Sequence, residues 1–184
     1  MKKITLFAWL IIASFISSAA FAQEKTVMVG GAAMYPSKNI IENAVNSKDH
    51  TTLVAAVKAA GLVETLEGPG PFTVFAPTNE AFDKLPKGAV EDLLKPENKG
   101  KLTSVLTYHV VPGKLTAMDL MKMIGDGNGK ATLKTVQGEN LYVSMNGKKL
   151  EVWDENGGMA TITISNVNQS NGVIHVVDTV LMPK

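Results

Sequence analysis

The sequence predicts an α+β fold, with helices concentrated in the first half of the chain and strands in the second. Up to about residue 124, apolar residues recur mainly at the three- and four-residue spacing of helices that bury one face. From Ala131 onward, short apolar stretches alternate with turns rich in glycine and asparagine, which is the pattern of strands. Helices followed by strands favour α+β over a doubly wound parallel fold, in which the two alternate.

Residues 1–22 have the organisation of a secretory signal peptide. A basic start precedes an apolar run over residues 4–16, and a small-x-small cleavage site ends at Ala22. The apolar run, at ~13 residues, is shorter than the ~20 that a helix needs to cross a bilayer. We therefore expect cleavage between Ala22 and Gln23, a periplasmic or secreted protein, and no membrane span once the signal is removed.

The remainder is expected to form one domain over residues 37–184, reached through a small and flexible approach segment over residues 23–36. Apolar stripes predict helices within residues 39–46, 53–61, 62–66, 88–94, 96–106 and 116–124. Gly61 follows the second of these as a C-cap, because glycine adopts the left-handed conformation in which helices end.

The most informative strand is the early one, residues 72–77, which is apolar at both alternating positions and so is expected to be covered on both faces. Pro77 ends it, and Thr78 or Asn79 can cap the next helix. Asn146-Gly147 predicts a type I′ hairpin. Further strands are expected at residues 107–111, 132–136, 141–145, 150–153, 160–167 and 173–181.

Composition narrows the classes of partner. The chain contains no cysteine, so its stability depends on packing and hydrogen bonds and not on disulfides. It contains no arginine, the residue that best contacts phosphates and guanine edges, and its formal net charge is +1. We therefore do not expect a nucleic-acid partner.

Two blocks of sequence resemble the fasciclin (FAS1) domain. The first is Phe72-Thr73-Val74-Phe75-Ala76-Pro77-Thr78-Asn79-Glu80-Ala81-Phe82, and the second runs from Asn171 to Pro183. Between them, Leu106 to Val111 is similar to the tyrosine-histidine segment of that family. The structural motif residues that the resemblance marks are Phe72, Val74, Phe75, Pro77, Thr78, Asn79, Phe82, His175 and Asp178.

The resemblance implies a β-sandwich or wedge of about seven strands with several packed helices, and the small secreted bacterial members of the family are the nearest in organisation. It also implies a non-catalytic adhesion or interaction module, and we expect it to bind an extracellular protein or polysaccharide. We further expect no cofactor and a monomer. Adhesive animal members carry an Asp-Ile motif before the second block. Residues 164–170 contain no acidic residue, so an integrin-type mechanism is not supported.

Three groups of side chains have alternative interpretations. By resemblance, Tyr108 and His109 form a partner-contact patch; alternatively, their apolar flanks predict burial, with the histidine bonded to backbone or to a neighbouring polar group. A second alternative makes the chain a small-ligand-binding protein or hydrolase with a pocket near His109. Tyr142, Met145 and Trp153 would be a sugar-stacking or protein-binding surface if they share an exposed face, and core if they do not.

Known catalytic and metal patterns do not match. There is no cysteine pair and no His-x-His or His-x-x-x-His spacing, which argues against zinc. Residues 126–129 begin like a calcium loop, but Lys130, Ala131 and Gln137 replace residues that the loop requires. No serine lies in Gly-x-Ser-x-Gly. We expect no catalytic residue and no metal; self-association as a structural envelope protein is a further alternative.

Overall fold

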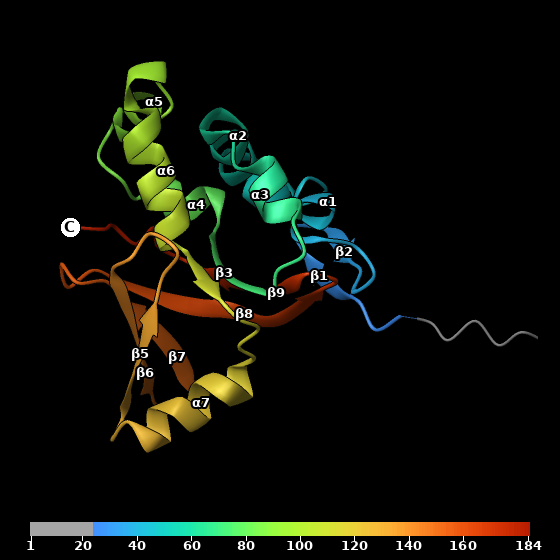
Figure 1. Cartoon of the computed structure of the whole chain (residues 1–184), viewed down its shortest axis with the longest axis vertical. Coiled ribbons are helices and arrows are strands. Elements are labelled where there is room, and N and C mark those ends of the chain that lie inside the picture. Colours follow the sequence, from blue (N-terminus) through green and yellow to red (C-terminus); the bar gives the residue numbers. More distant parts are fainter. Residues whose placement is uncertain (1–23) are drawn as a thin grey trace, which may run out of the picture.

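The computed structural model describes residues 24–184; the predicted signal peptide over residues 1–22 and the cleavage point between Ala22 and Gln23 lie outside this range. The helices are α1 (Ile40–Ala44), α2 (Thr51–Ala60), α3 (Val63–Glu67), α4 (Asn79–Asp83), α5 (Ala89–Leu93), α6 (Lys99–Tyr108) and α7 (Ala117–Asp126), with short 3-10 turns η1 (Lys48–His50) and η2 (Pro96–Asn98). The strands are β1 (Val27–Val29), β2 (Ala32–Met34), β3 (Phe72–Pro77), β4 (Val110–Pro112), β5 (Lys130–Lys134), β6 (Asn140–Asn146), β7 (Lys149–Trp153), β8 (Met159–Gln169) and β9 (Gly172–Val177). This order confirms the predicted α+β class (Figure 1).

A seven-stranded sheet with the order β4-β3-β9-β8-β7-β6-β5 organises the domain. Strands β3 and β9 pair in parallel, from Phe72 opposite Gly172 to Pro77 opposite Val177. The two blocks that resemble the fasciclin domain are therefore side by side in the sheet. The sheet curls until its ends meet, because the N–H of Val136, just after β5, donates to the carbonyl of Val110 in β4 at 2.8 Å. The seven strands of this sheet match the expected number, and β1 and β2 form a separate two-stranded sheet.

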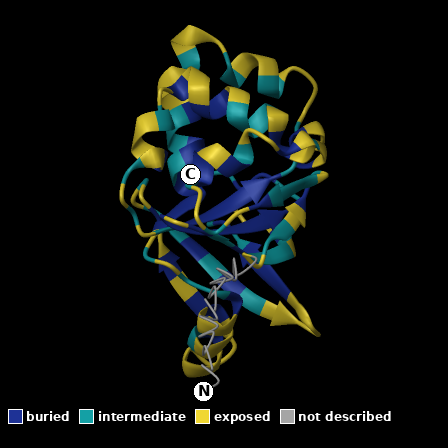
Figure 2. Ribbon diagram, turned by 90° about the vertical axis from the view of Figure 1, so that its right-hand side faces the viewer, coloured by how far each residue is buried: buried dark blue, intermediate teal, exposed yellow. Residues whose placement is uncertain are grey.

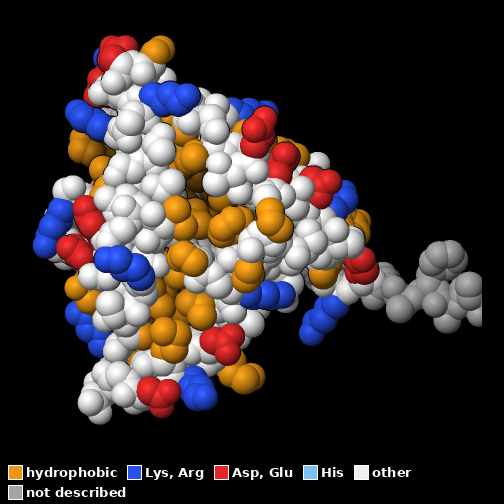
Figure 3. All heavy atoms as spheres, viewed as in Figure 1, with side chains coloured by type: hydrophobic (Ala, Val, Ile, Leu, Met, Phe, Trp, Pro, Cys, Tyr) orange, Lys and Arg blue, Asp and Glu red, His pale blue; other side chains and the backbone are white. Residues whose placement is uncertain are grey.

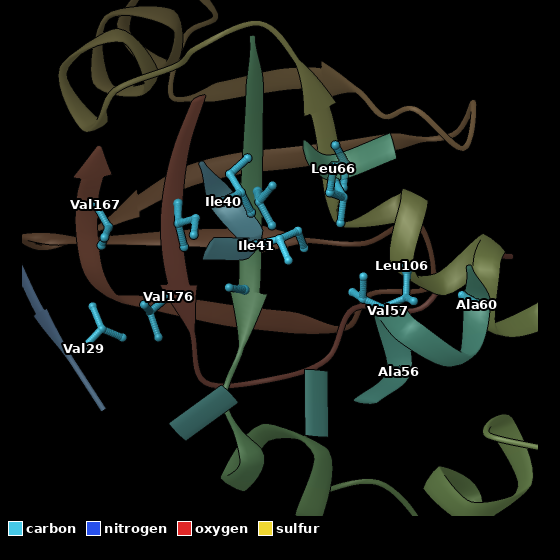
Figure 4. Packing of buried hydrophobic residues seen from close by; sticks show 14 of the residues in the cluster. Val29, Ile40, Ile41, Ala56, Val57, Ala60, Leu66, Leu106, Val167 and Val176 are labelled. Atoms are coloured by element: carbon cyan, nitrogen blue, oxygen red, sulfur yellow. The ribbon is translucent and has the colours of Figure 1, made fainter. Parts of the chain in front are cut away.

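Two hydrophobic cores lie on opposite sides of β3. Val74 and Ala76 belong to the core beneath α1, α2, α3 and α6, part of which is drawn in Figure 4. Phe75 belongs to the core within the curl of the sheet, which α7 also covers. Strand β3 is thus covered on both faces, as its sequence predicts, and Figure 2 shows the buried strands between the helices and the exposed end of the sheet.

The approach segment differs from expectation. Residues 27–34 form a hairpin, β1–β2, and its Val29 and Met34 are part of the core under the helices. Gly30 makes the turn possible: its φ is +56°, and a Cβ there would collide with Ser47 and the backbone of Lys48. Gly30, which suggested flexibility in the sequence, is instead required by this close packing, whereas Gly31 has open space around it and a positive φ of 77°.

Two local predictions also need correction. Residues 107–111 were expected to be a strand, but α6 continues through Tyr108, and only Val110 begins β4. The helical spacing of Leu102, Val105 and Leu106 extends into this segment and outweighs its strand propensity. The predicted hairpin after β6 is present, but its two loop residues are Gly147 and Lys148, and only the first has positive φ, as in a type II′ turn.

Candidate functional site

Tyr108 and His109, which the resemblance suggested as a partner-contact patch, lie inside the protein. Their exposed fractions are 0% and 3%. The Tyr108 hydroxyl donates to the carbonyl of Asn140 at 2.8 Å and accepts from the backbone N–H of Glu155 at 3.2 Å. Burial raises the pKa of Tyr108 to about 12. Neither side chain offers a surface to a partner, so the contact-patch expectation gives way to the alternative of buried, hydrogen-bonded residues.

Both ring nitrogens of His109 are occupied by backbone groups. Nδ1 lies 2.8 Å from the carbonyl of Val105, and Nε2 lies 3.0 Å from the backbone N–H of Leu181. Because that N–H can only donate, Nε2 accepts, and Nδ1 carries the proton that it donates to Val105. Burial lowers the pKa of His109 from 6.5 to about 4, so the ring is neutral. It ties α6 to the C-terminal segment and has no free nitrogen for proton transfer.

A pocket near His109 exists but is small. His109 and His50 line an apolar cavity of about 50 Å³ among α2, α3, α6 and β3. In Figure 3 hydrophobic side chains gather along the seam between α6 and the α2–α3 pair. Within residues 24–184, Nε2 of His50 is the buried side-chain nitrogen that has no hydrogen-bond partner. The volume suits a few water molecules and falls well below the ~300 Å³ at which ligand pockets begin.

His175 and Asp178, marked by the resemblance, hold the two sequence blocks to the rest of the sheet. The fully buried His175 lies against Phe75 with ring centroids 5.8 Å apart, and its Nε2 is 2.8 Å from the carbonyl of Leu115. Burial lowers its pKa. Asp178 accepts the backbone N–H of Thr161 at 2.7 Å. Both side chains are engaged in internal bonds.

The sequence predicts that either Thr78 or Asn79 caps α4, and the structure gives the two residues different roles. The Thr78 hydroxyl accepts the backbone N–H of Ala81 at 3.2 Å and is the N-cap of α4. Asn79 instead joins α4 to the start of α2, since its Oδ1 accepts the N–H of Thr52 at 3.0 Å and its Nδ2 donates to the carbonyl of Lys48 at 2.9 Å. Phe82 on the same helix is buried. These motif residues build the helix–sheet junction.

The segment where adhesive relatives carry Asp-Ile is an irregular part of β8. The register with β9 shifts twice between Ile162 and Val167, and Asn166 has a positive φ of 58°. The side-chain oxygen of Asn166 accepts the backbone N–H of Ala117 at 2.7 Å, at the first residue of α7. Here the position supports a helix start.

A candidate site that is accessible to solvent lies on the outer face of β5, β6 and β7, which faces away from α7. Tyr142 on β6 and Trp153 on β7 are opposite one another in the ladder, and both are partly exposed. Their neighbours Val143 and Val152 point to the buried core on the other face. Met145 shares that inner parity, with Leu150 as its partner, so it is not part of the aromatic pair. Of the two alternatives for these aromatic residues, the structure favours a partly exposed Tyr142–Trp153 pair on the outer face over core residues.

This pair borders a recess of about 430 Å³, which we call the aromatic recess. Its lining residues are Lys130, Tyr142, Ser144, Trp153, Asp154, Glu155, Gly157 and Lys184. The Trp153 indole N–H donates to the Ser144 hydroxyl at 3.1 Å, which fixes the orientation of the ring. Lys130 Nζ lies 3.9 Å from the centroid of the Tyr142 ring. The volume is within the range of ~300–1,000 Å³ typical of ligand pockets.

The two carboxylates of the recess are engaged by other groups of the protein. Asp154 accepts the backbone N–H groups of Asn156, Gly158 and Met182 at 2.9, 2.7 and 3.0 Å. Glu155 accepts from the backbone and side chain of Asn140 and pairs with Lys184 at 3.2 Å. The hydrogen bonds from Asn140 and then the Lys184 ammonium lower the pKa of Glu155. Lys130, by contrast, contacts only a ring among the described interactions.

Sequence reasoning found part of this site. It grouped Tyr142 and Trp153, but it could not assign the strand register that puts them opposite each other. It missed Lys130, Ser144 and Lys184 entirely. Lys130 and Ser144 could have been found from a correct register of β5 against β6, since they are directly paired. Nothing in the sequence indicates that the C-terminal Lys184 returns to this face.

Residues 24–184 contain no cluster of three or more histidine, cysteine, aspartate or glutamate side chains arranged to hold a metal ion. Within the same range, no helix has the length and apolar character needed to cross a bilayer.

The comparisons with known proteins agree on one family. A family model described as Fasciclin domain matches residues 48–183. Protein sll1483 of Synechocystis sp. is 47% identical over 160 residues, covering 87% of this chain and 82% of that protein. The cell surface glycolipoprotein MPB83 of Mycobacterium bovis is 34% identical over 188 residues, covering 91% of this chain and 78% of the relative.

A solved structure shows the same fold. The FAS1 domain pair of the insect cell adhesion molecule Fasciclin I aligns with a TM-score of 0.70, covering 85% of this chain and 57% of that one. At 17% identity, the match concerns the fold alone.

Proposed function

The chain belongs to the fasciclin domain family, and on that premise we propose that it is a secreted, non-catalytic binding module that contacts an extracellular protein or polysaccharide through the aromatic recess. A relative supports the setting, since it is named a cell surface glycolipoprotein. Members of the family act as adhesion or extracellular interaction proteins.

The observation that carries this proposal is the open Tyr142–Trp153 pair beside a recess of about 430 Å³. Aromatic side chains at a surface supply contact area with little loss of conformational freedom, and they are frequent anchors of binding interfaces. The other face of the same strands is mostly buried in the core, with Met145 near the hairpin as an exposed exception. The outer face is therefore the part of this half of the domain that remains available to a partner.

Two observations favour binding over the alternatives. At His109 both ring nitrogens are bonded and the adjoining cavity is about 50 Å³, which is too small for a hydrolase substrate. For self-association, an unpaired sheet edge is the usual route. Here the chain after β5 bonds to β4, which covers part of the two edges and supports a monomer.

The test is a pull-down from extracellular matrix and envelope material with the purified protein and a Tyr142→Ala, Trp153→Ala double variant. We expect the double variant to lose captured material while keeping its fold, as judged by circular dichroism. Tyr35→Ala is the matched control, because Tyr35 is also exposed and also lies under a lysine, Lys38, at 5.0 Å. Equal capture by all three proteins would contradict a role for the recess.

Export is tested separately. The N-terminal peptide of the protein recovered outside the cytoplasm, identified by mass spectrometry, should begin at Gln23. A protein that retains residues before Ala22 would contradict cleavage at this position.

A further inference from the structure

The aromatic recess has the features of a site for one particular class of ligand. Its wall is in part oriented before anything binds: the Trp153 indole N–H donates to the Ser144 hydroxyl, and Tyr142 lies opposite Trp153 in the ladder with Lys130 over its ring. Binding to a preformed aromatic surface loses less conformational entropy than binding to mobile side chains. The ligand is therefore expected to present a face that lies flat against an indole.

The rim of the recess is polar around this apolar surface. Lys130 and Lys184 are donors, and the hydroxyls of Tyr142 and Ser144 both donate and accept. A purely apolar ligand would cover the Lys130 ammonium and the Tyr142 hydroxyl without offering them a hydrogen-bond partner, which is unfavourable. A pyranose ring matches both features, because its C–H face is apolar and its hydroxyl groups surround that face. The arrangement thus favours a sugar over an apolar small molecule.

The charged side chains around the recess indicate which class of sugar fits it. Asp154 accepts three backbone N–H groups, and Glu155 accepts from Asn140 and pairs with Lys184, so both carboxylates already have partners inside the protein. The Lys130 ammonium faces only the Tyr142 ring. Lys134 and Lys149 lie on the same outer parity of β5 and β7 and are exposed. Glu151, on the same parity of β7, is buried and accepts from the side chain of Asn146 at 2.7 Å. The exposed charge on this face is therefore positive.

We propose that the aromatic recess binds an acidic sugar residue of the uronic acid type within an extracellular polysaccharide, with the ring against Trp153 and the carboxylate at Lys130. This rests on the proposed function and names the partner of the same site. The interaction is electrostatic in part, so its affinity falls as salt is added.

Isothermal titration calorimetry of the purified protein with oligomers of alginate and of polygalacturonate tests this inference. The fully methyl-esterified form of polygalacturonate is the matched probe, because it keeps the sugar backbone and removes the charge. We expect binding to the acidic oligomers and at least a tenfold loss with the ester, as follows from removing a charge-assisted hydrogen bond. Equal binding of acid and ester would overturn the assignment of an acidic sugar.

Variants locate the site. Lys130→Gln should weaken binding roughly tenfold without affecting folding, since Lys130 is exposed and makes no hydrogen bond within the described chain. Trp153→Ala should abolish it. Lys38→Gln is the control, because it removes a lysine that lies over the Tyr35 ring elsewhere. Unchanged affinity in Lys130→Gln and Trp153→Ala would place the binding site elsewhere and overturn the inference.

The failure of this inference is distinguishable from failure of the proposed function. If neither acidic oligomer binds, the sugar assignment is wrong. The pull-down then decides the broader proposal: capture that still depends on Tyr142 and Trp153 leaves the recess as a binding face for a partner of different chemistry. Capture that does not depend on them removes both proposals.

Discussion

The buried strand pair β3–β9 and the outer face of β5–β7 belong to one sheet, but they differ in what their side chains can do. Residues of β9 are buried along its whole length, and only Phe72 of β3 is partly exposed. On the outer face of β5–β7, Tyr142 and Trp153 are open and border a recess. The β3–β9 pair carries the two sequence blocks that resemble the family, and it builds the domain. The outer face of β5–β7 carries no family motif, and it is the face available for binding. We therefore expect substitutions in the two regions to affect different properties.

The largest effect is expected from Phe75→Ala. The Phe75 side chain is fully buried and lies against His175, so truncation leaves a cavity that the surrounding strands cannot fill. The free energy of unfolding should fall by about 3–5 kcal/mol, measured by urea denaturation. Phe75→Leu, which retains more volume, should lose less. Polysaccharide affinity of the folded fraction should stay unchanged, and a loss of affinity without a loss of stability would break the comparison.

Acidification should have the next largest effect on the stability of the protein. Above pH 6.5, His109 is neutral in both the folded and the unfolded chain, so its titration does not change the stability there. Below that pH, His109 binds a proton in the unfolded chain, whereas in the folded chain it binds one only near its pKa of about 4. Stability therefore falls between pH 6.5 and 4, by about 3 kcal/mol from this residue. Burial lowers the pKa values of His50 and His175 too, which adds in the same direction.

Urea unfolding of the wild type and of His109→Gln at pH 7 and at pH 4.5 measures this. Glutamine has no comparable titration, so the variant should start less stable and lose less stability on acidification. Identical losses in the two proteins would contradict the assignment to His109.

The fold was accessible from the sequence where local signals agreed with tertiary packing. Strand β3 showed apolar residues at both parities because cores lie on both of its faces. The segment around Tyr108 was mispredicted because its strand propensity is local, whereas the packing that keeps it helical comes from distant parts of the chain. Gly30 was read as flexible because the sequence does not reveal its contact with Ser47.

A smaller loss of stability is expected from Thr78→Ala, at the junction between β3 and α4. The Thr78 hydroxyl caps α4 by accepting the N–H of Ala81. Its removal should lower the free energy of unfolding by about 1 kcal/mol in urea denaturation. Thr78→Ser keeps the oxygen and should retain most of the stability. If serine and alanine lose the same amount, the cap is not the source of the effect.

The candidate site was less accessible than the fold, for a reason that Lys130 and Lys184 illustrate. Lys130 reaches the Tyr142 ring through the register of β5 on β6, and Lys184 arrives from the end of the chain to pair with Glu155. Both contacts join residues that are separated along the sequence, and no local pattern indicates that they meet. Conversely, Tyr108 and His109 formed a recognisable local segment, yet their roles are internal. A sequence pattern indicates where a family resemblance lies, and only the register indicates which side chains share a surface.

The smallest effect on stability should accompany a large effect on binding. Tyr142→Ala removes one member of an exposed cross-strand pair, which contributes about 0.2–1 kcal/mol to stability. The same change removes the ring that supports Lys130 and borders the recess, so affinity for an acidic oligosaccharide should fall at least tenfold. Calorimetry and urea denaturation on the same preparation measure both, with Tyr35→Ala as the exposed-tyrosine control. A variant that loses several kcal/mol of stability would mean that the outer face also supports the fold. The two regions would then not divide construction from binding.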